Sequence, residues 1–365
     1  MNMLNKNSVK ELKQNKRINN FADGIAAAFF DSMRYDPTVL AFGLGATDPK
    51  NIFGTMAGLE DEFGNERVFD TPISENAMTG MAIGLAISGY KPVLTHQRLD
   101  FSLLSIDQIV NAAAKWYFMF GGQQSVPLVI RMIIGQGWGQ GPTHSQALQS
   151  WFAQIPGLKV IMPAFPKDGY NLFRSSIADP NPVIFIEHRW LHQMSWNGEG
   201  RVVSPTQLGK SNRISTGSDI TIVSNSIGSV YSHHAANILK KYNVGVEVID
   251  AFNLRDFDIN SVSKSVAKTG RLLTVDFSHQ FCSIGTEIIA QVLPLNFADL
   301  KIAPERIALP NFPVGTSFNI EKDFYFSTID ICKKIESMLN VTFPNIDDEL
   351  KEYQSSSKKR FDGPF

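Results

Sequence analysis

Short apolar runs alternate with longer segments of helical periodicity along most of the chain. In the first half, runs with strand character lie at 39–44, 92–96, 127–132, 158–162 and 183–187. Segments with helical periodicity separate several of them, at 75–88, 105–120 and 145–154. Neighbouring parallel strands need a long connection, usually a helix, so this alternation is typical of a parallel sheet covered by helices. The pattern therefore predicts an α/β fold.

The same alternation resumes near residue 218, which indicates a second domain. Strands are predicted at 219–223, 245–249 and 271–276, and helices at 230–242, 259–267 and 327–339. Between 191 and 217 the periodicity is lost and Gly, Ser, Pro and Trp gather, as expected of a linker. We therefore predict a polar extension at 1–16, a first domain at 17–190, this linker, a second domain at 218–342 and a charged tail at 343–365. We expect the tail to be ordered only where a partner covers it.

Composition narrows the possible partners. Lys and Arg number 34 against 35 Asp and Glu, so the formal charge of -1 favours neither nucleic acid nor an anionic membrane. The two cysteines, Cys282 and Cys332, are too few for a disulfide framework. The first twenty residues are polar, and no segment approaches the roughly 20 apolar residues that span a bilayer. We expect a cytoplasmic protein whose ligand is a small molecule or another protein.

Five blocks of sequence follow one another in the first domain. They are ERVFDTPISE at 66–75, SIDQIVNAAAKWYFMFGGQQSVPLVIR at 105–131, THSQ at 143–146, PGLKVIMP at 156–163 and DPNPVIFIE at 179–187. In this order they resemble the β subunits of the decarboxylating component of 2-oxo acid dehydrogenases, of the pyruvate and branched-chain types. The resemblance continues more weakly to about residue 340, through a carboxyl-terminal domain shared with transketolases. It implies a pyrimidine-binding domain followed by a transketolase C-terminal-like domain.

The resemblance assigns the central role to Glu75, at the start of a predicted helix. It implies that thiamine diphosphate lies between chains and that this Glu hydrogen-bonds a ring nitrogen of the aminopyrimidine. A proton shifted at that nitrogen favours the imino form, which can accept the proton of the thiazolium carbon. The structural alternative is that Glu75 interacts only with the helix dipole, which favours any carboxylate in a first turn.

Other residues are placed around the same cofactor by the resemblance. Ile73 is expected to contact the pyrimidine, Gln97 matches a cofactor-binding Gln of the branched-chain type, and Phe101 matches an aromatic residue that packs on the ring. Asp100 also matches that type. Core packing would explain Phe101 equally well. His144, in THSQ, matches a histidine that lies near the bound intermediate and assists proton transfer or binds its carboxylate, although a lone His is more often structural.

A potassium ion is a further expectation. The carbonyl of Ser176 together with Asp179 and Asn181 falls where the resembled family often binds this ion, and hard oxygen ligands suit it. The same residues also make an ordinary Asp-Pro-Asn-Pro turn. The other histidines show no metal-binding spacing and are expected at the surface or in loops; they are His96, His188, His192, His233, His234 and His279.

One motif is missing from the chain. Thiamine diphosphate is usually held through Mg²⁺ by a Gly-Asp-Gly motif, and none occurs in the 365 residues. We therefore expect an α-type partner that carries this motif and holds most of the Mg²⁺ site. The resemblance implies an α2β2 heterotetramer, active only when assembled, with a lipoyl acyltransferase as a possible further partner.

Departures from the family pattern keep other functions open. The chain reads Gly43-Leu44-Gly45-Ala46 where the family usually has an acidic residue after Gly, and Thr95, His96 and Arg98 replace more apolar or acidic residues. The leading hypothesis is 2-oxo acid decarboxylation with acyl transfer to a lipoyl domain. The first alternative is a split transketolase-like or acyloin-forming enzyme with a sugar or aldehyde acceptor. The second is a non-catalytic scaffold subunit, against which the retention of both Glu75 and His144 argues.

Overall fold

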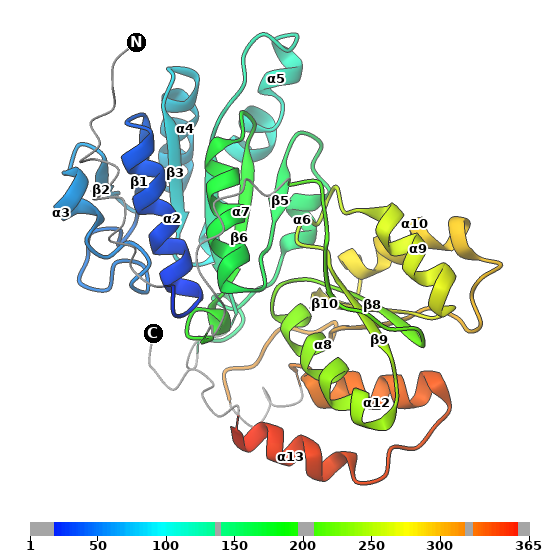
Figure 1. Ribbon diagram of the computed structural model, residues 1–365. Helices are drawn as coiled ribbons and strands as arrows, with labels where there is room; N and C mark the ends of the chain where they lie inside the picture. Colours follow the sequence, from blue (N-terminus) through cyan, green and yellow to red (C-terminus); the bar gives the residue numbers. More distant parts are fainter. Residues whose placement is uncertain (1–17, 136–139, 196–207, 318–323, 357–365) are drawn as a thin grey trace, which may run out of the picture.

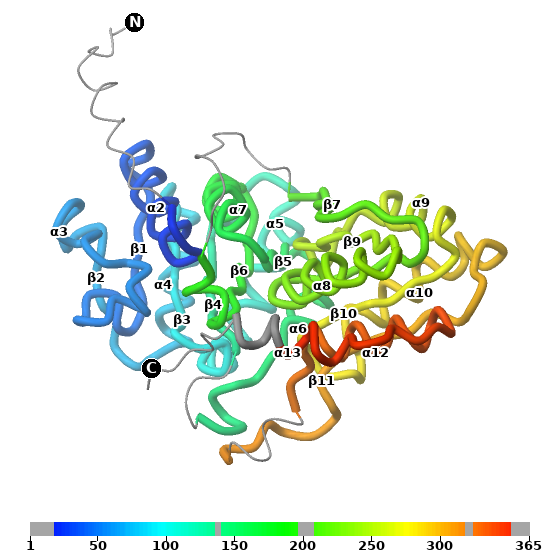
Figure 2. Tube along the Cα trace, turned by 60° about the horizontal axis from the view of Figure 1, so that its bottom comes forward, coloured from blue at the N-terminus to red at the C-terminus, as the bar shows by residue number. Residues whose placement is uncertain are grey.

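The computed structural model describes residues 18–135, 140–195, 208–317 and 324–356, which form two α/β units (Figure 1). Each unit is a sheet with helices packed on it, as the alternation of apolar runs and helical segments predicts. The two units remain side by side when the molecule is turned (Figure 2). The predicted fold class is confirmed.

The first sheet has six strands, all parallel, in the order β2-β1-β3-β4-β6-β5. Its strands are β1 (Val39–Gly43), β2 (Val68–Asp70), β3 (Lys91–His96), β4 (Val129–Ile134), β5 (Lys159–Ile161) and β6 (Val183–His188). The helices of this unit are α2 (Phe21–Tyr35), α3 (Leu59–Phe63), α4 (Glu75–Ile87), α5 (Trp116–Met119), α6 (Gln149–Ala153), α7 (Pro166–Ala178) and the 3-10 helix η3 (Arg189–Leu191). Strands β1, β4 and β6 are buried at every position, which is why their sequences are nearly continuous apolar runs.

Helices α2 and α7 lie side by side over the first sheet (Figure 1). The rings of Phe29 and Phe173 meet edge to face at 4.8 Å, and the Tyr170 hydroxyl donates to the Asp31 carboxylate at 2.7 Å. Asn20 caps α2, because its side-chain oxygen accepts a hydrogen bond from the Asp23 amide at 2.8 Å. These contacts hold α2 and α7 together on the first sheet.

The second sheet has five strands in the order β11-β10-β8-β9-β7, parallel except for β7. Its strands are β7 (Asn212–Ser215), β8 (Ile220–Ser224), β9 (Val246–Asp250), β10 (Leu272–His279) and β11 (Glu305–Leu309). Its helices are α8 (Ser226–Leu239), the 3-10 helix η4 (Lys240–Tyr242), α9 (Ile259–Thr269), α10 (Ile284–Asn296), α12 (Thr328–Leu339) and α13 (Ile346–Ser356). In Figure 1, α9 and α10 lie on one side of this sheet and α8 and α12 on the other.

Two elements lie in the segments predicted as the linker and the charged tail. Strand β7 falls inside the predicted linker, where it pairs antiparallel with β9 as the edge of the second sheet. Helix α13 falls inside the predicted charged tail and was expected to need a partner. Its side chains Ile346 and Leu350 are buried, so contacts within the chain help to hold this helix.

The continuous helix predicted at 105–120 is wrong. The chain there forms a 3-10 helix η1 (Leu99–Ser105), a π-helix η2 (Gln108–Ala113) and the single turn of α5. Four consecutive large side chains, 117–120, are exposed, so the segment has no single buried face. At Gly157 an added Cβ would lie 1.9 Å from the Ala114 carbonyl oxygen, which shows how closely the backbone of this segment is packed.

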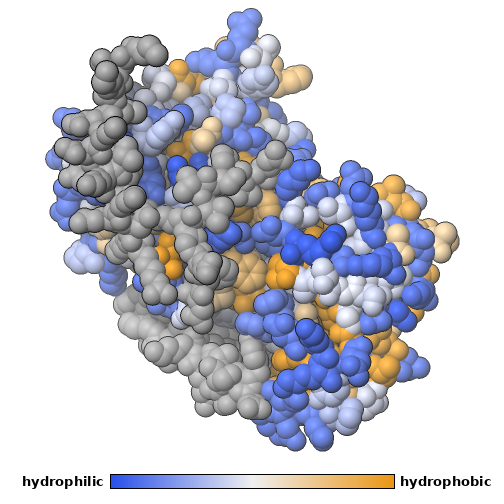
Figure 3. All heavy atoms as spheres, in the orientation of Figure 1, coloured by the Kyte–Doolittle hydropathy of each residue, from blue (hydrophilic) through white to orange (hydrophobic). Residues whose placement is uncertain are grey.

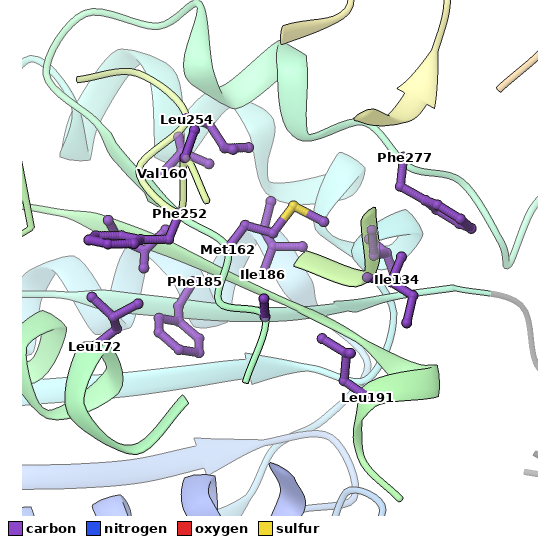
Figure 4. Close-up of a cluster of buried hydrophobic side chains, with 14 of the residues drawn as sticks. Ile134, Val160, Met162, Leu172, Phe185, Ile186, Leu191, Phe252, Leu254 and Phe277 are labelled. Atoms are coloured by element: carbon purple, nitrogen blue, oxygen red, sulfur yellow. The ribbon is translucent and has the colours of Figure 1, made fainter. Parts of the chain in front are cut away.

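Backbone hydrogen bonds join the two units. The Met162 amide donates to the Phe252 carbonyl at 2.7 Å, and the Leu254 amide donates to the Val160 carbonyl at 2.9 Å. Figure 4 shows the apolar side chains of these residues gathered with Phe185 from β6 in one buried cluster. The hydrophobic core therefore continues from the first unit into the second.

A buried ion pair crosses the middle of the first sheet. The guanidinium of Arg131, on β4, bonds both carboxylate oxygens of Glu187, on β6, and the His192 imidazole lies 2.8 Å from the same carboxylate. All three side chains are fully buried. Burial would raise the pKa of the Glu187 carboxyl, but Arg131 and His192 outweigh it and lower that pKa from 4.5 to about 2. The stabilisation from ionised Glu187 is thus present above pH 4.5 and is lost as the pH falls towards 2.

We predict that Glu187→Gln lowers the free energy of unfolding at pH 7 by about 3–5 kcal/mol, because it leaves the Arg131 charge buried without its partner. Urea unfolding should also show a weaker loss of stability between pH 4.5 and 3.5 in the variant than in the wild type. Glu62→Gln is the matched control, since its ion pair with Arg34 is exposed and should be worth at most about 1 kcal/mol. Equal losses in the two variants would contradict this account.

Candidate functional site

The residues expected to form the site all follow strands of the first sheet at its carboxyl edge. Glu75 lies five residues after β2, Gln97 and Phe101 follow β3, and His144 lies in the connection from β4 to α6. In parallel α/β sheets this edge is where ligands bind, because the loops there are free to vary over a rigid scaffold. These four residues therefore lie along one edge of the sheet.

Glu75 is the first residue of α4 and is half-buried. Its backbone carbonyl accepts a hydrogen bond from the Thr79 hydroxyl at 2.8 Å, whereas no hydrogen bond among the described residues engages its carboxylate. Ile73, two residues earlier, exposes 76% of its side chain. A carboxylate without a partner beside an exposed apolar side chain suits a bound group that has both a polar nitrogen and an apolar ring.

The start of α4 is held against the 3-10 helix η1, which carries Phe101. The Asn76 amide nitrogen donates to the Leu104 carbonyl at 3.5 Å, and the Gln108 amide nitrogen donates to Asn76 at 3.3 Å. Helix α4 also packs along η1. The fold thus brings Glu75 and Phe101 to neighbouring elements, although they are 26 positions apart in the sequence.

Phe101 and His144 are in direct contact. Their rings meet edge to face with centroids 5.4 Å apart, and Phe101 is half-buried while His144 is exposed. The Thr143 hydroxyl lies 3.0 Å from His144 Nδ1, so it contributes to the orientation of the imidazole. Gly141, just before, lies against Thr316 of the second unit, where an added Cβ would be 2.6 Å from the threonine hydroxyl oxygen.

Gln97 faces the loop after β1. Its amide nitrogen donates to the Leu44 carbonyl at 2.9 Å, and at Gly45, where φ is +77°, an added Cβ would lie 2.1 Å from that nitrogen. The Gly45 amide in turn donates to the Asp70 carboxylate at 2.8 Å. Leu44 stands in this loop where the resemblance led us to expect an acidic residue, and Asp70 places a carboxylate in contact with the loop. Gln97 therefore stabilises the loop after β1, next to the residues expected to bind the cofactor.

Three histidines that were predicted at the surface or in loops are buried, so that prediction is wrong for them. His96 is 5% exposed, and His188 and His192 are fully buried. Each lies at or just after the end of a buried strand, where the loops fold back over the sheet. Burial lowers the pKa of His96 to about 4 and that of His188 to about 3, the latter with help from nearby positive charge. His233, His234 and His279 are partly buried.

Two arginines that sequence reasoning did not place in the site lie behind it. The guanidinium carbons of Arg98 and Arg189 lie 5.7 Å and 4.4 Å from the centroid of the Phe53 ring. Both side chains are buried, and burial lowers the pKa of each to about 10. Arg98 donates to the Gly135 carbonyl at the end of β4. The sequence signals for Arg98 were its place two residues after β3 and its departure from the expected family pattern.

The residues expected to bind potassium lie at the end of α7. The Asp179 carboxylate is paired with the Lys159 ammonium and accepts a hydrogen bond from the Asn181 amide at 2.9 Å, while the Ser176 carbonyl accepts one from the Asp179 amide at 3.3 Å. Because Lys159 neutralises the carboxylate, a cation here would depend on carbonyl oxygens. Within the described ranges, no group of three or more His, Cys, Asp or Glu side chains could hold a metal ion, and no helix is long and apolar enough to cross a bilayer.

Comparison with known proteins identifies both units. Residues 20–193 match the transketolase pyrimidine-binding domain, and residues 209–331 match the transketolase C-terminal domain. Over 82% of the chain, the sequence is 36% identical to the pyruvate dehydrogenase E1 component subunit β of Rhizobium meliloti, 65% of whose length is covered. It is 34% identical over 87% of the chain to the mitochondrial pyruvate dehydrogenase E1 component subunit β of Saccharomyces cerevisiae, 88% of which is covered.

The chain belongs to the family of E1 β subunits. A further relative is the acetoin:2,6-dichlorophenolindophenol oxidoreductase subunit β of Cupriavidus necator, 37% identical over 82% of this chain and 91% of that protein. A split-gene transketolase, described as an inactive β4 tetramer, shares the fold with a TM-score of 0.69 and 16% identity, covering 89% of this chain and 99% of that one. Membership of the E1 β family implies thiamine diphosphate as cofactor and an α partner.

We predict that His96 and His188 stay uncharged from pH 5 to pH 8, because burial lowers both pKa values well below this range. In a ¹H–¹³C NMR titration their ring resonances, assigned with His96→Gln and His188→Gln, should not shift over it. N-acetylhistidine in the same tube gives the reference titration near about 6.5. A midpoint above pH 5 for either ring would contradict its placement in the interior.

Proposed function

We propose that this chain is the β subunit of a thiamine diphosphate-dependent 2-oxo acid dehydrogenase (decarboxylating), in which Glu75 activates the aminopyrimidine of the cofactor. The observation that supports this most is the Glu75 carboxylate, which begins α4 at the carboxyl edge of the sheet and has no partner among the described residues. Phe101 and His144 lie in contact on the neighbouring elements. Membership of the E1 β family supplies the chemistry that such a carboxylate would serve.

The residues present fit the pyrimidine half of thiamine diphosphate. When bound, this cofactor supplies a thiazolium carbon that loses its proton and attacks the substrate carbonyl. Glu75 would hold and move a proton at the ring nitrogen, Ile73 and Phe101 would hold the ring by apolar contact, and Gln97 would brace the adjoining wall. His144, exposed beside Phe101, would act on the substrate, by proton transfer or by binding its carboxylate.

An α-type chain would hold the diphosphate and Mg²⁺, because this chain lacks the Gly-Asp-Gly motif. The surface of this chain exposes apolar side chains that an α-type chain would cover in the assembled enzyme. Large apolar side chains are exposed at Ile73, Leu104, Tyr117, Phe118, Met119, Phe120, Phe281, Leu295 and Phe297. On the face shown in Figure 3, apolar residues interrupt the mostly polar surface of the second unit. We propose an α2β2 heterotetramer that passes its acyl group to a lipoyl acyltransferase.

The second candidate is an acyloin-type enzyme of the same cofactor class. Identity to the Cupriavidus necator acetoin:2,6-dichlorophenolindophenol oxidoreductase subunit is as high as to the pyruvate dehydrogenase subunits. Leu44 and Arg98 depart from the usual E1 β pattern near the site. Turnover assays of the assembled enzyme with pyruvate, branched-chain 2-oxo acids and acetoin, each with a lipoyl domain or the dye as acceptor, would separate the two candidates.

Two finer assignments stay predictions. A cytoplasmic location is one, because relatives such as the Saccharomyces cerevisiae subunit are mitochondrial. Potassium at Ser176, Asp179 and Asn181 is the other. The pairing of Asp179 with Lys159 leaves carbonyl oxygens as the main ligands, so the ion would bind weakly.

We predict that Glu75→Gln in the assembled enzyme leaves cofactor binding nearly unchanged but slows deuterium exchange at the thiazolium carbon by about 10²–10⁴-fold, the usual worth of general acid-base catalysis. Quenched-flow NMR with wild type and variant saturated with cofactor measures this rate. Glu66→Gln, an exposed carboxylate in the same sequence block, is the control and should exchange normally. A loss of only a few-fold in Glu75→Gln would fit an interaction with the helix dipole instead.

We also predict that the purified chain alone binds thiamine diphosphate and Mg²⁺ poorly and does not turn over, because half of the site is missing. Isothermal titration calorimetry of the chain, with and without an α-type subunit, measures this. Tight stoichiometric binding by the chain by itself would overturn the proposal of a site shared between two chains.

A further inference from the structure

The segment after β3 contacts the connection from β4 to α6 at both ends. At the near end, the Arg98 guanidinium donates to the carbonyl of Gly135, the first residue after β4. At the far end, one carboxylate oxygen of Asp100 accepts hydrogen bonds from the Gln146 side chain at 2.8 Å and from the Gln146 amide at 3.3 Å. His144 lies between these two attachment points.

The near attachment leaves Gly135 little freedom. Arg98 is 3% exposed, and among the described residues its Nη2 has no hydrogen-bond partner, so the bond to Gly135 is the main polar contact seen there for this buried cation. Gly135 has φ of +90°, and an added Cβ would lie 2.6 Å from the His188 ring. The carbonyl is therefore held from one side by Arg98, while the His188 ring closes the other.

The far attachment is charge-assisted. Asp100 is 8% exposed, and a buried carboxylate that accepts two hydrogen bonds from one residue gives a directional contact stronger than a bond between neutral groups. Burial raises the pKa of Asp100 and the bonds from Gln146 oppose this, as expected where they stabilise the ionised form. Phe101, the next residue, then packs on the His144 ring.

We propose that Asp100 is a positioning residue that holds His144 against Phe101 through its two hydrogen bonds with Gln146, while Arg98 holds Gly135 at the end of β4. A group displaced by about 1 Å can lose on the order of 10² in rate, so this attachment would determine how well His144 meets the substrate. The structural part of the proposal stands on the contacts alone. Its catalytic part rests on the proposed function.

The first test measures the structural part on the full chain without cofactor or partner. In Asp100→Ala, hydrogen–deuterium exchange of peptides within 140–148 should be about tenfold faster than in the wild type, because the local attachment is lost. Gln146→Ala should speed exchange by the same factor, because it removes the side-chain bond to Asp100 by changing the loop residue and leaves the buried Asp100 in place. Asp100→Asn keeps an acceptor oxygen and should exchange nearly as slowly as the wild type.

Asp107→Ala is the matched control. Its carboxylate is exposed and, among the described residues, accepts hydrogen bonds from Gln108 and Asn111 of its own segment alone, so it should leave exchange in 140–148 unchanged. Unchanged exchange in both Asp100→Ala and Gln146→Ala would overturn the proposal, whatever the enzyme's activity.

The second test measures the catalytic part in the assembled enzyme. Asp100→Ala should lower kcat by about 10–100-fold while deuterium exchange at the thiazolium carbon persists, and Asp100→Asn should restore most of kcat. Added to His144→Ala, Asp100→Ala should cause little further loss, because it acts through a side chain that is already absent. Losses that multiply in the double variant would overturn the positioning role. If Glu75→Gln also exchanges normally, the proposed function fails, and the amide exchange result still decides the structural part.

Discussion

The ion pair between Arg131 and Glu187 is the constraint on which the first unit depends. Two charges that water cannot reach are tolerated when they are paired in a fixed geometry, and the Glu187 carboxylate contacts Arg131 and His192 at once. Arg131 lies on β4 and Glu187 on β6, so the pair fixes these strands relative to each other near their carboxyl ends. Gly135 follows the last residue of β4, and His188 follows Glu187, so the ion pair also restricts the positions of these two residues. The connection that carries His144 starts at the end of β4, so its starting point is held by this buried pair.

The sequence was most informative where burial alone decides the structure. The strands predicted at 92–96 and 183–187 differ by a single residue from Lys91–His96 and Val183–His188, because strands buried on both faces are continuous apolar runs. The helix predicted at 105–120 was wrong because helical periodicity does not distinguish one continuous α-helix from the succession of 3-10, π and α turns that the chain forms here. β7 escaped prediction because it is a short edge strand with exposed or half-buried side chains, ordered by pairing with a distant partner.

For the site, motifs predicted which residues gather, but not how they are held. Glu75 and His144 lie in two of the sequence blocks, Phe101 follows the strand predicted at 92–96, and Phe101 and His144 are in contact. The burial of His192 could not be foreseen, since it depends on a carboxylate whose position is fixed by another strand. The same holds for Arg98, whose direction is set by Gly135 and Phe53, residues from two other loops. Contacts between loops depend on tertiary structure, which local patterns do not encode.

The backbone hydrogen bonds between residues 160–162 and 252–254 have a consequence for how the polypeptide holds together. They join the end of β5 in the first unit to the segment after β9 in the second, and Phe252 and Leu254 are buried in the core that the two units share (Figure 4). The peptide chain between the two units is then not what keeps them together. A protease cut there would leave a nicked molecule that migrates as one particle, and the two halves produced as separate polypeptides would have a preformed surface on which to reassemble.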